Sequence, residues 1–217
     1  MSKKIGLMGG TFDPIHIGHI NLAKSASQIY NLDEVWFIPT GISYLKKDRN
    51  VTDASTRLEM TRLAIEDIND CSVTDFEIKR QGFTYTFETL IELRKEYPGY
   101  EFYFIMGRDS LLYFDKWYMP EKILENAIVL AGTREGSSVD ELLNKAEYCM
   151  EQLGGKISVF EFEDIPYSST KIRELCKQLS STNFNNLEKE KTLDLLIKAV
   201  PTKTLDYILE KGIYSKV

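Results

Sequence analysis

The sequence predicts an α/β protein with a Rossmann-like, doubly wound parallel sheet and a small C-terminal helical extension. Short apolar segments typical of buried strands alternate with segments of helical periodicity over most of the chain. The first apolar segment ends in two glycines and is followed closely by a helical pattern. Because parallel strands need a crossover connection, the helices between them are expected to cover both faces of the sheet.

The N-terminal half of the chain shows this alternation clearly. Ile20, Ala23 and Ala26 recur at roughly helical spacing after the first strand, and Pro39 stops the second strand. The polar, lysine-bearing segment 41–55 is predicted to be a loop. We expect strands over residues 4–10, 34–40 and 71–78, and helices over residues 19–30, 56–68 and 86–97.

The C-terminal half continues the alternation and then contains helical patterns alone. The segment "EFYFIMG" has the composition of a central parallel strand, and the polar segment 180–191 is expected to be an exposed connection. We expect strands over residues 101–107, 126–132 and 156–162, and helices over residues 138–153, 168–179, 192–200 and 202–214. Residues 1–180 are therefore predicted to form one Rossmann-like domain, and residues 181–217 a helical extension packed on that domain.

Composition and charge restrict the function classes. The 217-residue chain has a formal net charge of −6, which disfavours a nucleic-acid partner but is compatible with a small anionic ligand in a local basic pocket. No segment approaches the roughly 20 apolar residues of a membrane span, so no membrane partner is expected. Cys71, Cys149 and Cys176 have no paired spacing, which fits a reducing cytoplasm without disulfides or a zinc site. The sequence leaves open whether the chain forms a homo-oligomer.

The segment "GGTFDPIHIGH" joins the first strand to the first helix and contains both histidines of the chain. Open parallel sheets bind ligands at the edge formed by the carboxyl ends of their strands, where this segment is expected to lie. Gly9 and Gly10 would let the backbone approach a phosphate near the helix N-terminus. His16 and His19 are three positions apart, so both rings can face the same side. They could donate hydrogen bonds to phosphate oxygens, bind a metal with a third ligand that is not evident nearby, or form an ordinary polar surface.

Other phosphate-binding patterns are poorly supported. The glycine spacing differs from that of the dinucleotide fingerprint G-x-G-x-x-G, and G-x-x-x-x-G-K-[ST] does not occur in the chain. A standard NAD site and a P-loop are therefore not expected.

The motif G-T-F-D-P-x-H-x-G-H resembles the signature of the HxGH nucleotidyltransferases, α/β enzymes that move a nucleotidyl group from ATP or CTP. The resemblance implies that His16 and His19 stabilise the α-phosphate and the departing pyrophosphate while a substrate phosphate attacks in line, without a covalent intermediate. It assigns ATP binding to the residues that begin the motif: Gly9, Gly10, Thr11 and Phe12.

The segment "YSSTKIR" follows an expected strand and opens a helix, where serine and threonine are ordinary caps. After the histidine motif, it resembles the family's I-S-S-T-x-I-R element, which binds the ATP phosphates. The resemblance assigns ATP binding to Ser168, Ser169, Thr170 and Arg173, with Arg173 as a charged clamp.

Two further segments resemble bacterial nicotinate-mononucleotide adenylyltransferases. "GFTYTFETL" resembles the segment that meets the pyridine carboxylate through backbone amides, and it places Thr86, with Tyr85 beside it, at the substrate. "MGRDSLLYFDKW" resembles the family's G-x-D…W block, which implies Gly107 and Asp109 at the nucleotide and Trp117 stacked on the nicotinate ring. From the residues alone, Thr86 is equally explained as a helix cap, and Trp117 is better explained as a core or interface aromatic.

The remaining matches contain two departures from the family pattern. "VLAGTREG" resembles the V-x-A-R-P-G turn, with Glu135 in place of the proline, and implies that Arg134 binds the substrate. "PTGISYLKKD" lacks the histidine of the family's P-P-H-K segment. Lys46 is the expected catalytic lysine at the phosphates, with Lys47 as the alternative, and a solvated loop charge is the other explanation. The ending "AVPTKTLDYILEKGIY" resembles the family's last helix, so the resemblance covers nearly the whole chain.

The resemblance implies transfer of AMP from ATP to nicotinate mononucleotide, which yields deamido-NAD and pyrophosphate in NAD biosynthesis. ATP would carry Mg²⁺, which is held by substrate oxygens and water, and no metal ligand is assigned to the protein. The groups expected to offset the growing negative charge are His16, His19, Lys46 and Arg173. The alternatives are a pantetheine-phosphate adenylyltransferase, a cytidylyltransferase or a non-catalytic nucleotide sensor. RNA binding like that of relatives of class I aminoacyl-tRNA synthetases is disfavoured by the acidic charge.

Overall fold

The computed structural model describes residues 2–43, 51–134, 139–163, 165–181 and 185–215. These residues contain a six-stranded sheet in the order β4-β2-β1-β6-β7-β8, in which all neighbours are parallel. Its strands are β1 (Lys3–Gly10), β2 (Glu34–Pro39), β4 (Cys71–Val73), β6 (Tyr100–Gly107), β7 (Ile128–Arg134) and β8 (Ile157–Phe162). The chain starts in the middle of the sheet, builds one edge and then the other, which is the doubly wound order and confirms the predicted fold class.

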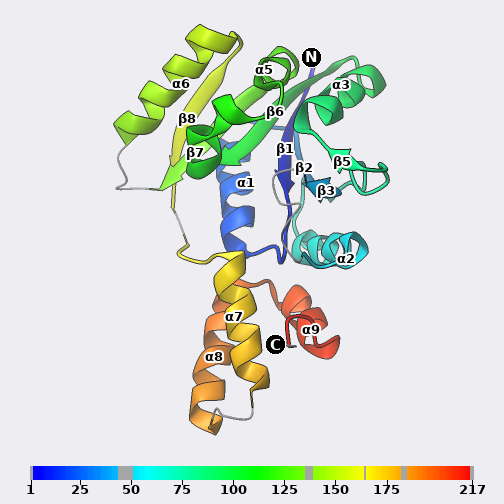
Figure 1. Ribbon diagram of the computed structural model, residues 1–217, viewed down its shortest axis with the longest axis vertical. Coiled ribbons are helices and arrows are strands. Elements are labelled where there is room, and N and C mark those ends of the chain that lie inside the picture. The colour runs from blue at the N-terminus through cyan, green and yellow to red at the C-terminus, as the bar shows by residue number, and fades with distance from the viewer. Residues whose placement is uncertain (1, 44–50, 135–138, 164, 182–184, 216–217) are drawn as a thin grey trace.

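Helices cover both faces of this sheet (Figure 1). Along β6, Tyr103 and Ile105 belong to one apolar cluster, whereas Phe104 and Met106 belong to another, because successive side chains of a strand point to opposite faces. The first cluster includes residues of α1 (Ile17–Tyr30), α2 (Ala54–Ile65), α7 (Ser169–Ser180), α8 (Asn186–Ala199) and α9 (Thr202–Glu210). The second includes residues of α3 (Thr86–Glu96), α4 (Arg108–Leu112), η2 (Phe114–Lys116), α5 (Pro120–Asn126) and α6 (Val139–Leu153).

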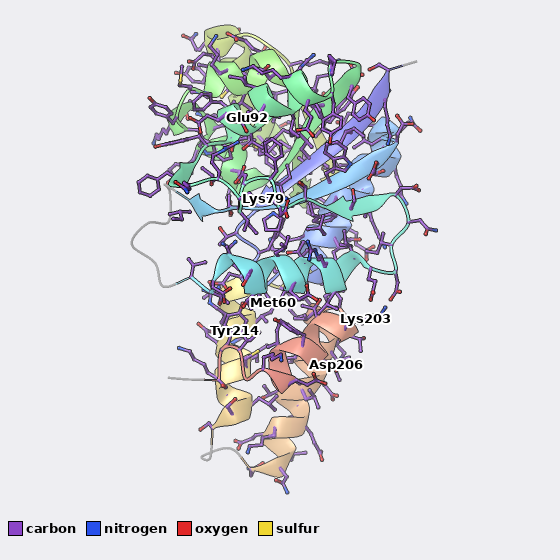
Figure 2. All side chains as sticks on the ribbon, turned by 90° about the vertical axis from the view of Figure 1, so that its right-hand side faces the viewer. Met60, Lys79, Glu92, Lys203, Asp206 and Tyr214 are labelled. Atoms are coloured by element: carbon purple, nitrogen blue, oxygen red, sulfur yellow. The ribbon has the colours of Figure 1, made fainter. Side chains whose placement is uncertain are left out.

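The C-terminal helices lie at the end of the molecule to which the carboxyl ends of the strands point. α7 and α8 form a pair that extends away from the sheet, and α9 turns back to lie against α2 (Figures 1 and 2). In the ranges that the structure describes, no helix is both long and apolar enough to cross a membrane.

The structure corrects the predicted strand over residues 71–78. β4 ends at Val73, because its neighbour β2 ends at Pro39, which has no N–H to continue the ladder. Residues 76–79 form a turn instead. The predicted loop 41–55 also contains β3 (Ile42–Ser43), which pairs with β5 (Phe83–Thr84) in a separate two-stranded sheet.

The prediction of a connection over residues 180–191 was wrong for its second part. α8 begins at Asn186, within that polar segment. The side chain of Asn185 accepts from the backbone N–H of Glu188 at 3.0 Å, and the Glu188 carboxylate accepts from the N–H of Asn185 at 2.9 Å. This reciprocal cap provides acceptors for two backbone N–H groups that have no partner within the helix. The helix therefore starts in a segment whose polar composition alone favoured a loop.

Candidate active site

The loop between β1 and α1 lies at the centre of the carboxyl edge of the sheet, between the two halves of the doubly wound order. Gly10 shapes this loop, because a Cβ there would lie 2.6 Å from Cε1 of Phe12. Phe12 has a left-handed backbone with φ 49°, and its ring is buried. The glycine therefore provides room for the Phe12 ring, a packing role that the sequence analysis did not anticipate.

The two histidine rings lie next to each other, as their spacing predicted. Their centroids are 3.8 Å apart, and the Phe12 ring meets the His19 ring edge to face at 5.2 Å. The backbone N–H of His16 donates to Nδ1 of His19 at 3.3 Å. Because Nδ1 accepts this bond, neutral His19 carries its hydrogen on Nε2 and can donate it to an anion.

His16 is held in its neutral form by burial. The residue is 8% exposed, and burial lowers its pKa from 6.5 to about 4. Its Nδ1 is buried without a hydrogen-bond partner and would lie 3.0 Å from a Cβ at position 18. Gly18 thus leaves the space that the His16 ring occupies. An anion that arrives at this ring would raise its pKa again.

We expect the buried neutral His16 to make the protein less stable in mild acid. The unfolded chain binds a proton at His16 near pH 6.5, whereas the folded protein binds it only near pH 4, so the free energy of unfolding falls as the pH drops through this window. The loss from this group is roughly 3 kcal/mol. Urea denaturation of the wild type and of His16→Gln between about pH 7 and pH 4 tests this. Equal pH dependence of the two proteins would contradict it.

Arg57 of α2 holds the start of the loop. It is 2% exposed, whereas Arg62 of the same helix is exposed. Its guanidinium donates to four backbone carbonyls: Thr11 (2.6 Å), Thr40 (2.8 Å), Thr52 (2.9 Å) and, at a longer distance, Gly41 (3.3 Å). The sequence analysis missed Arg57, since an arginine in a helical pattern gives no sign that the fold will bring four carbonyls around it.

The N-terminus of α7 meets the same loop from the other side. Ser168 caps the helix by accepting from the N–H of Lys171 at 3.2 Å, and the hydroxyl of Ser169 donates to the carbonyl of Pro14 at 2.9 Å. These two hydroxyls therefore have structural partners. The backbone amides at the start of α7 have no intrahelical acceptor, and they are the groups of this segment best suited to bind an anion.

Arg173 connects α7 to the loop. Its Nη1 donates to the carbonyl of Asp13 at 2.7 Å, and its Nη2 donates to the hydroxyl of Thr170 at 3.2 Å. These bonds hold the guanidinium in one place at the edge of the sheet. A fixed guanidinium of this kind suits the recognition of phosphate oxygens.

A hollow of about 540 Å³ opens at this edge. It is lined by the histidine motif, the start of α4 and the N-terminus of α7, and so brings together both histidines and every residue predicted to bind ATP. These residues are Gly9, Gly10, Thr11, Phe12, His16, His19, Gly107, Asp109, Ser168, Ser169, Thr170 and Arg173.

A second hollow, of about 190 Å³, adjoins the first. It is lined by Thr86 and Trp117, and both hollows share Gly9, Gly10, Thr11, Phe104, Ser110 and Trp117. Thr86 is the first residue inside α3 and Tyr85 is the N-cap, so Thr86 is not the helix cap. Tyr85 lies outside the lining of both hollows, with its ring 5.0 Å from that of Tyr118.

Trp117 lies in the shared wall between the hollows. Its ring centroid is 6.2 Å from that of Phe104 and 5.6 Å from that of Phe114. The indole is half-buried, so it is supported by the apolar cluster and still borders both hollows. Its contacts with Phe104 and Phe114 are those of a core aromatic. Its place in the lining of both hollows is also compatible with stacking on a substrate ring, the role that the family resemblance implied.

Glu77 is a wall residue that sequence reasoning missed. It is buried, and burial raises the pKa of its carboxyl group, while the hydroxyl of Thr89 donates to Oε1 at 2.9 Å. The turn over residues 76–79 places Glu77 in the lining of the smaller hollow. The sequence analysis expected a strand over residues 71–78, and that expectation gave no reason to place a buried carboxyl group at residue 77.

Three predicted features are placed only in part or not at all. Lys46 and its alternative Lys47 lie outside the described residues, and Arg134 is the last residue of β7, with a side chain that is likewise not described.

Among the residues that are described, no group of three or more His, Cys, Asp or Glu side chains could hold a metal ion. The three cysteines are unpaired.

Comparison with known proteins identifies the family. A model of the cytidylyltransferase-like family matches residues 7–175, which include both histidines and Arg173. A probable nicotinate-nucleotide adenylyltransferase of Lachnoclostridium phytofermentans is 35% identical over 212 residues, which cover 98% of this chain and 99% of the relative. The chain belongs to the nicotinate-nucleotide adenylyltransferase family. A second probable member of that family, from Bacillus cytotoxicus, is 36% identical over 98% of both chains.

Solved structures with this fold come from the same kind of protein. Plasmodium falciparum nicotinic acid mononucleotide adenylyltransferase complexed with APC has a TM-score of 0.72 at 21% identity. The same protein complexed with NaAD has a TM-score of 0.74 at 22% identity. Each comparison covers 98% of this chain and 97% of the other, so the whole fold of this nicotinate-nucleotide adenylyltransferase family member is shared with them.

Proposed function

We propose that the protein transfers AMP from ATP to nicotinate mononucleotide and releases pyrophosphate and deamido-NAD. The observation that carries this proposal is the pair of adjoining hollows, one lined by the histidine pair and the other by Thr86, with Trp117 in their shared wall. Two substrates that must react with each other need such neighbouring sites. The names of the relatives support the choice of these substrates.

The larger hollow is the proposed ATP site. Arg173 and the amides at the start of α7 would bind the phosphates, and Asp109 in its wall would accept hydrogen bonds from waters around the Mg²⁺ that ATP carries. We propose that the protein itself contributes no complete metal site, since Mg²⁺ typically keeps several waters and substrate oxygens in such sites. Lys46 remains a predicted further contact to the phosphates.

The reaction needs positioning and charge stabilisation rather than a covalent intermediate. A phosphate oxygen of nicotinate mononucleotide attacks the α-phosphorus, and the bond from that phosphorus to the bridging oxygen breaks, so the electron pair leaves with pyrophosphate. The attacking phosphate is already largely ionised near neutral pH, since its second pKa is about 6. No general base is therefore required, and the N–H donors of His16 and His19 offset the charge that grows on the phosphate oxygens.

The smaller hollow is the proposed site of the pyridine ring. The backbone N–H of Thr86 belongs to the first turn of α3, has no intrahelical acceptor, and would bind the carboxylate of the nicotinate group. The half-buried indole of Trp117 would stack on the ring. Tyr85 and Arg134 remain predicted substrate contacts.

Pyrophosphate release tests the proposed function. Purified protein with ATP and Mg²⁺ should release pyrophosphate faster with nicotinate mononucleotide than with nicotinamide mononucleotide, because the amide lacks the charge that the Thr86 N–H would bind. Equal rates would contradict the carboxylate contact. No release with either substrate would contradict the function, and faster reaction with CTP than with ATP would favour a cytidylyltransferase.

A matched pair of tryptophan variants tests the ring platform in the same assay. Trp117→Phe should raise KM for nicotinate mononucleotide several-fold and leave KM for ATP nearly unchanged. The reason is that a phenyl ring offers the pyridine ring a smaller stacking face than an indole does. Trp36→Phe is the control, because Trp36 packs on Tyr97 at 5.2 Å and lies outside the lining of both hollows. Equal effects of the two substitutions would contradict the stacking role.

A further inference from the structure

The C-terminal segment after α9 reaches the loop that carries the histidines. The hydroxyl of Tyr214 donates to Oδ1 of Asp13 at 2.6 Å, across 201 positions of sequence. Asp13 is 6% exposed, lies three residues before His16, and lines the larger hollow. A residue near the end of the chain is thus in direct contact with the centre of the proposed ATP site.

The route of the chain explains how Tyr214 arrives there. α9 is fastened to α2, because the hydroxyl of Thr204 donates to the carbonyl of Met60 at 3.0 Å and Lys203 forms an ion pair with Glu66 at 2.7 Å. Figure 2 shows Lys203 and Tyr214 toward opposite ends of this segment, beneath α2. Gly212 follows the C-cap residue Lys211 of α9 and has φ 61°, which turns the chain back toward the loop.

Tyr214 is built into this position at some conformational cost. Its φ of 65° is left-handed, a conformation that is unfavourable for a residue with a Cβ. Its hydroxyl lies 3.8 Å from Sδ of Met60 in addition to its bond to Asp13. Burial is the largest cause that raises the pKa of Tyr214, so the hydroxyl keeps its proton and remains a donor.

The bond from Tyr214 orients the Asp13 carboxylate. A negative charge in the wall of an anion site repels phosphates, and because a neutral hydroxyl leaves that charge unchanged, its hydrogen bond acts by holding the carboxylate in a fixed place. Oδ1 accepts from Tyr214, and Oδ2 accepts from the backbone N–H of Thr52 at 3.4 Å, a longer and weaker bond. The bond from Tyr214 is the shorter of the two and is the main anchor of this side chain.

We propose that Tyr214 is a positioning residue for the nucleotidyl transfer: its hydroxyl anchors the Asp13 carboxylate on the α2–α9 side of the loop and thereby keeps both this charge and the neighbouring histidines in place for ATP. This inference rests on the proposed function. It assigns a catalytic consequence to Tyr214, a residue that itself lines neither hollow.

Tyr214→Phe tests the proposal because it removes only the hydroxyl. We expect kcat/KM for ATP to fall about tenfold, with KM for nicotinate mononucleotide changed less than about twofold, because the freed carboxylate disturbs only the phosphate site. Tyr207→Phe, also from the C-terminal segment but outside the lining of both hollows, is the matched control and should keep wild-type kinetics. The folded fraction of each protein is measured by circular dichroism, so that lost folding is not counted as lost activity.

A second background isolates the contact with Asp13. In Asp13→Asn no charge is freed when the tyrosine hydroxyl is removed, so adding Tyr214→Phe should lower kcat/KM for ATP less than about threefold. An undiminished tenfold effect in that background, or wild-type kinetics of Tyr214→Phe itself, would overturn the proposal. A wild-type protein without turnover would overturn the proposed function instead, and the two failures are therefore distinguishable.

Discussion

Replacement of His19 by alanine is expected to lower kcat by about 10²–10³, the usual effect of losing one preorganised hydrogen-bond donor to a developing negative charge. The ring of His19 is oriented by the edge-to-face contact with Phe12 and by the bond that Nδ1 accepts from the N–H of His16. In the proposed mechanism the N–H at Nε2 of His19 donates to the phosphate oxygens. Alanine removes this donor and leaves the backbone of α1 intact.

Steady-state pyrophosphate release at saturating ATP and nicotinate mononucleotide measures this effect. His19→Gln keeps an N–H donor on a side chain of similar length and should recover part of the lost rate. Lys24→Ala, an exposed position on the same helix, should keep the wild-type kcat. A near-normal rate of His19→Ala, with the control unchanged, would exclude the catalytic role.

The largest loss of stability is expected for Arg57→Met. Its buried guanidinium donates to the carbonyls of Thr11, Thr40 and Thr52 and, at a longer distance, of Gly41. Methionine would leave all four carbonyls without these donors. A hydrogen bond from a charged donor contributes roughly 1.5–3 kcal/mol, and methionine keeps part of the packing, so we expect the free energy of unfolding to fall by roughly 4 kcal/mol.

Urea denaturation at neutral pH tests this expectation. Arg62→Met is the matched control on the same helix, because the Arg62 side chain is 53% exposed and its ion pair with Glu59 is 3.9 Å long. Its free energy of unfolding should change by less than about 1 kcal/mol. Arg57→Lys, which keeps the charge but not the planar fork, should recover only part of the loss. Equal effects of Arg57→Met and Arg62→Met would contradict the role of Arg57.

The fold class could be predicted because its signals are local. Apolar runs such as "EFYFIMG" are typical of strands covered on both faces, and their alternation with helical patterns allows few topologies. The errors fell where a neighbouring residue or a side-chain cap decided the outcome. Pro39 of the adjacent strand ended β4, and the reciprocal cap of Asn185 and Glu188 started α8.

The candidate site was predictable where it consists of contiguous motifs. The spacing of His16 and His19 placed both rings on one side of a helix start, and the serines of "YSSTKIR" indicated a helix N-terminus. The resemblance to a known family indicated that these motifs meet. Glu77 was missed because its place in the lining of the smaller hollow depends on the turn over residues 76–79. The sequence pattern of that segment predicted a continued strand instead.

The sequence by itself determined the six strands of the main sheet and most of the helices between them, the glycine-rich turn after the first strand, and the pair of imidazoles three positions apart. These follow from periodicity, from turn chemistry and from the geometry of one helical turn, all of which act over a few residues. Only the tertiary structure decided that Arg57 would bind the carbonyl of Thr11, and that Tyr214 would bind Asp13. Such contacts join residues that are distant in sequence, and they exist only after the packing of α2 against the sheet, and of α9 against α2, has brought their partners together.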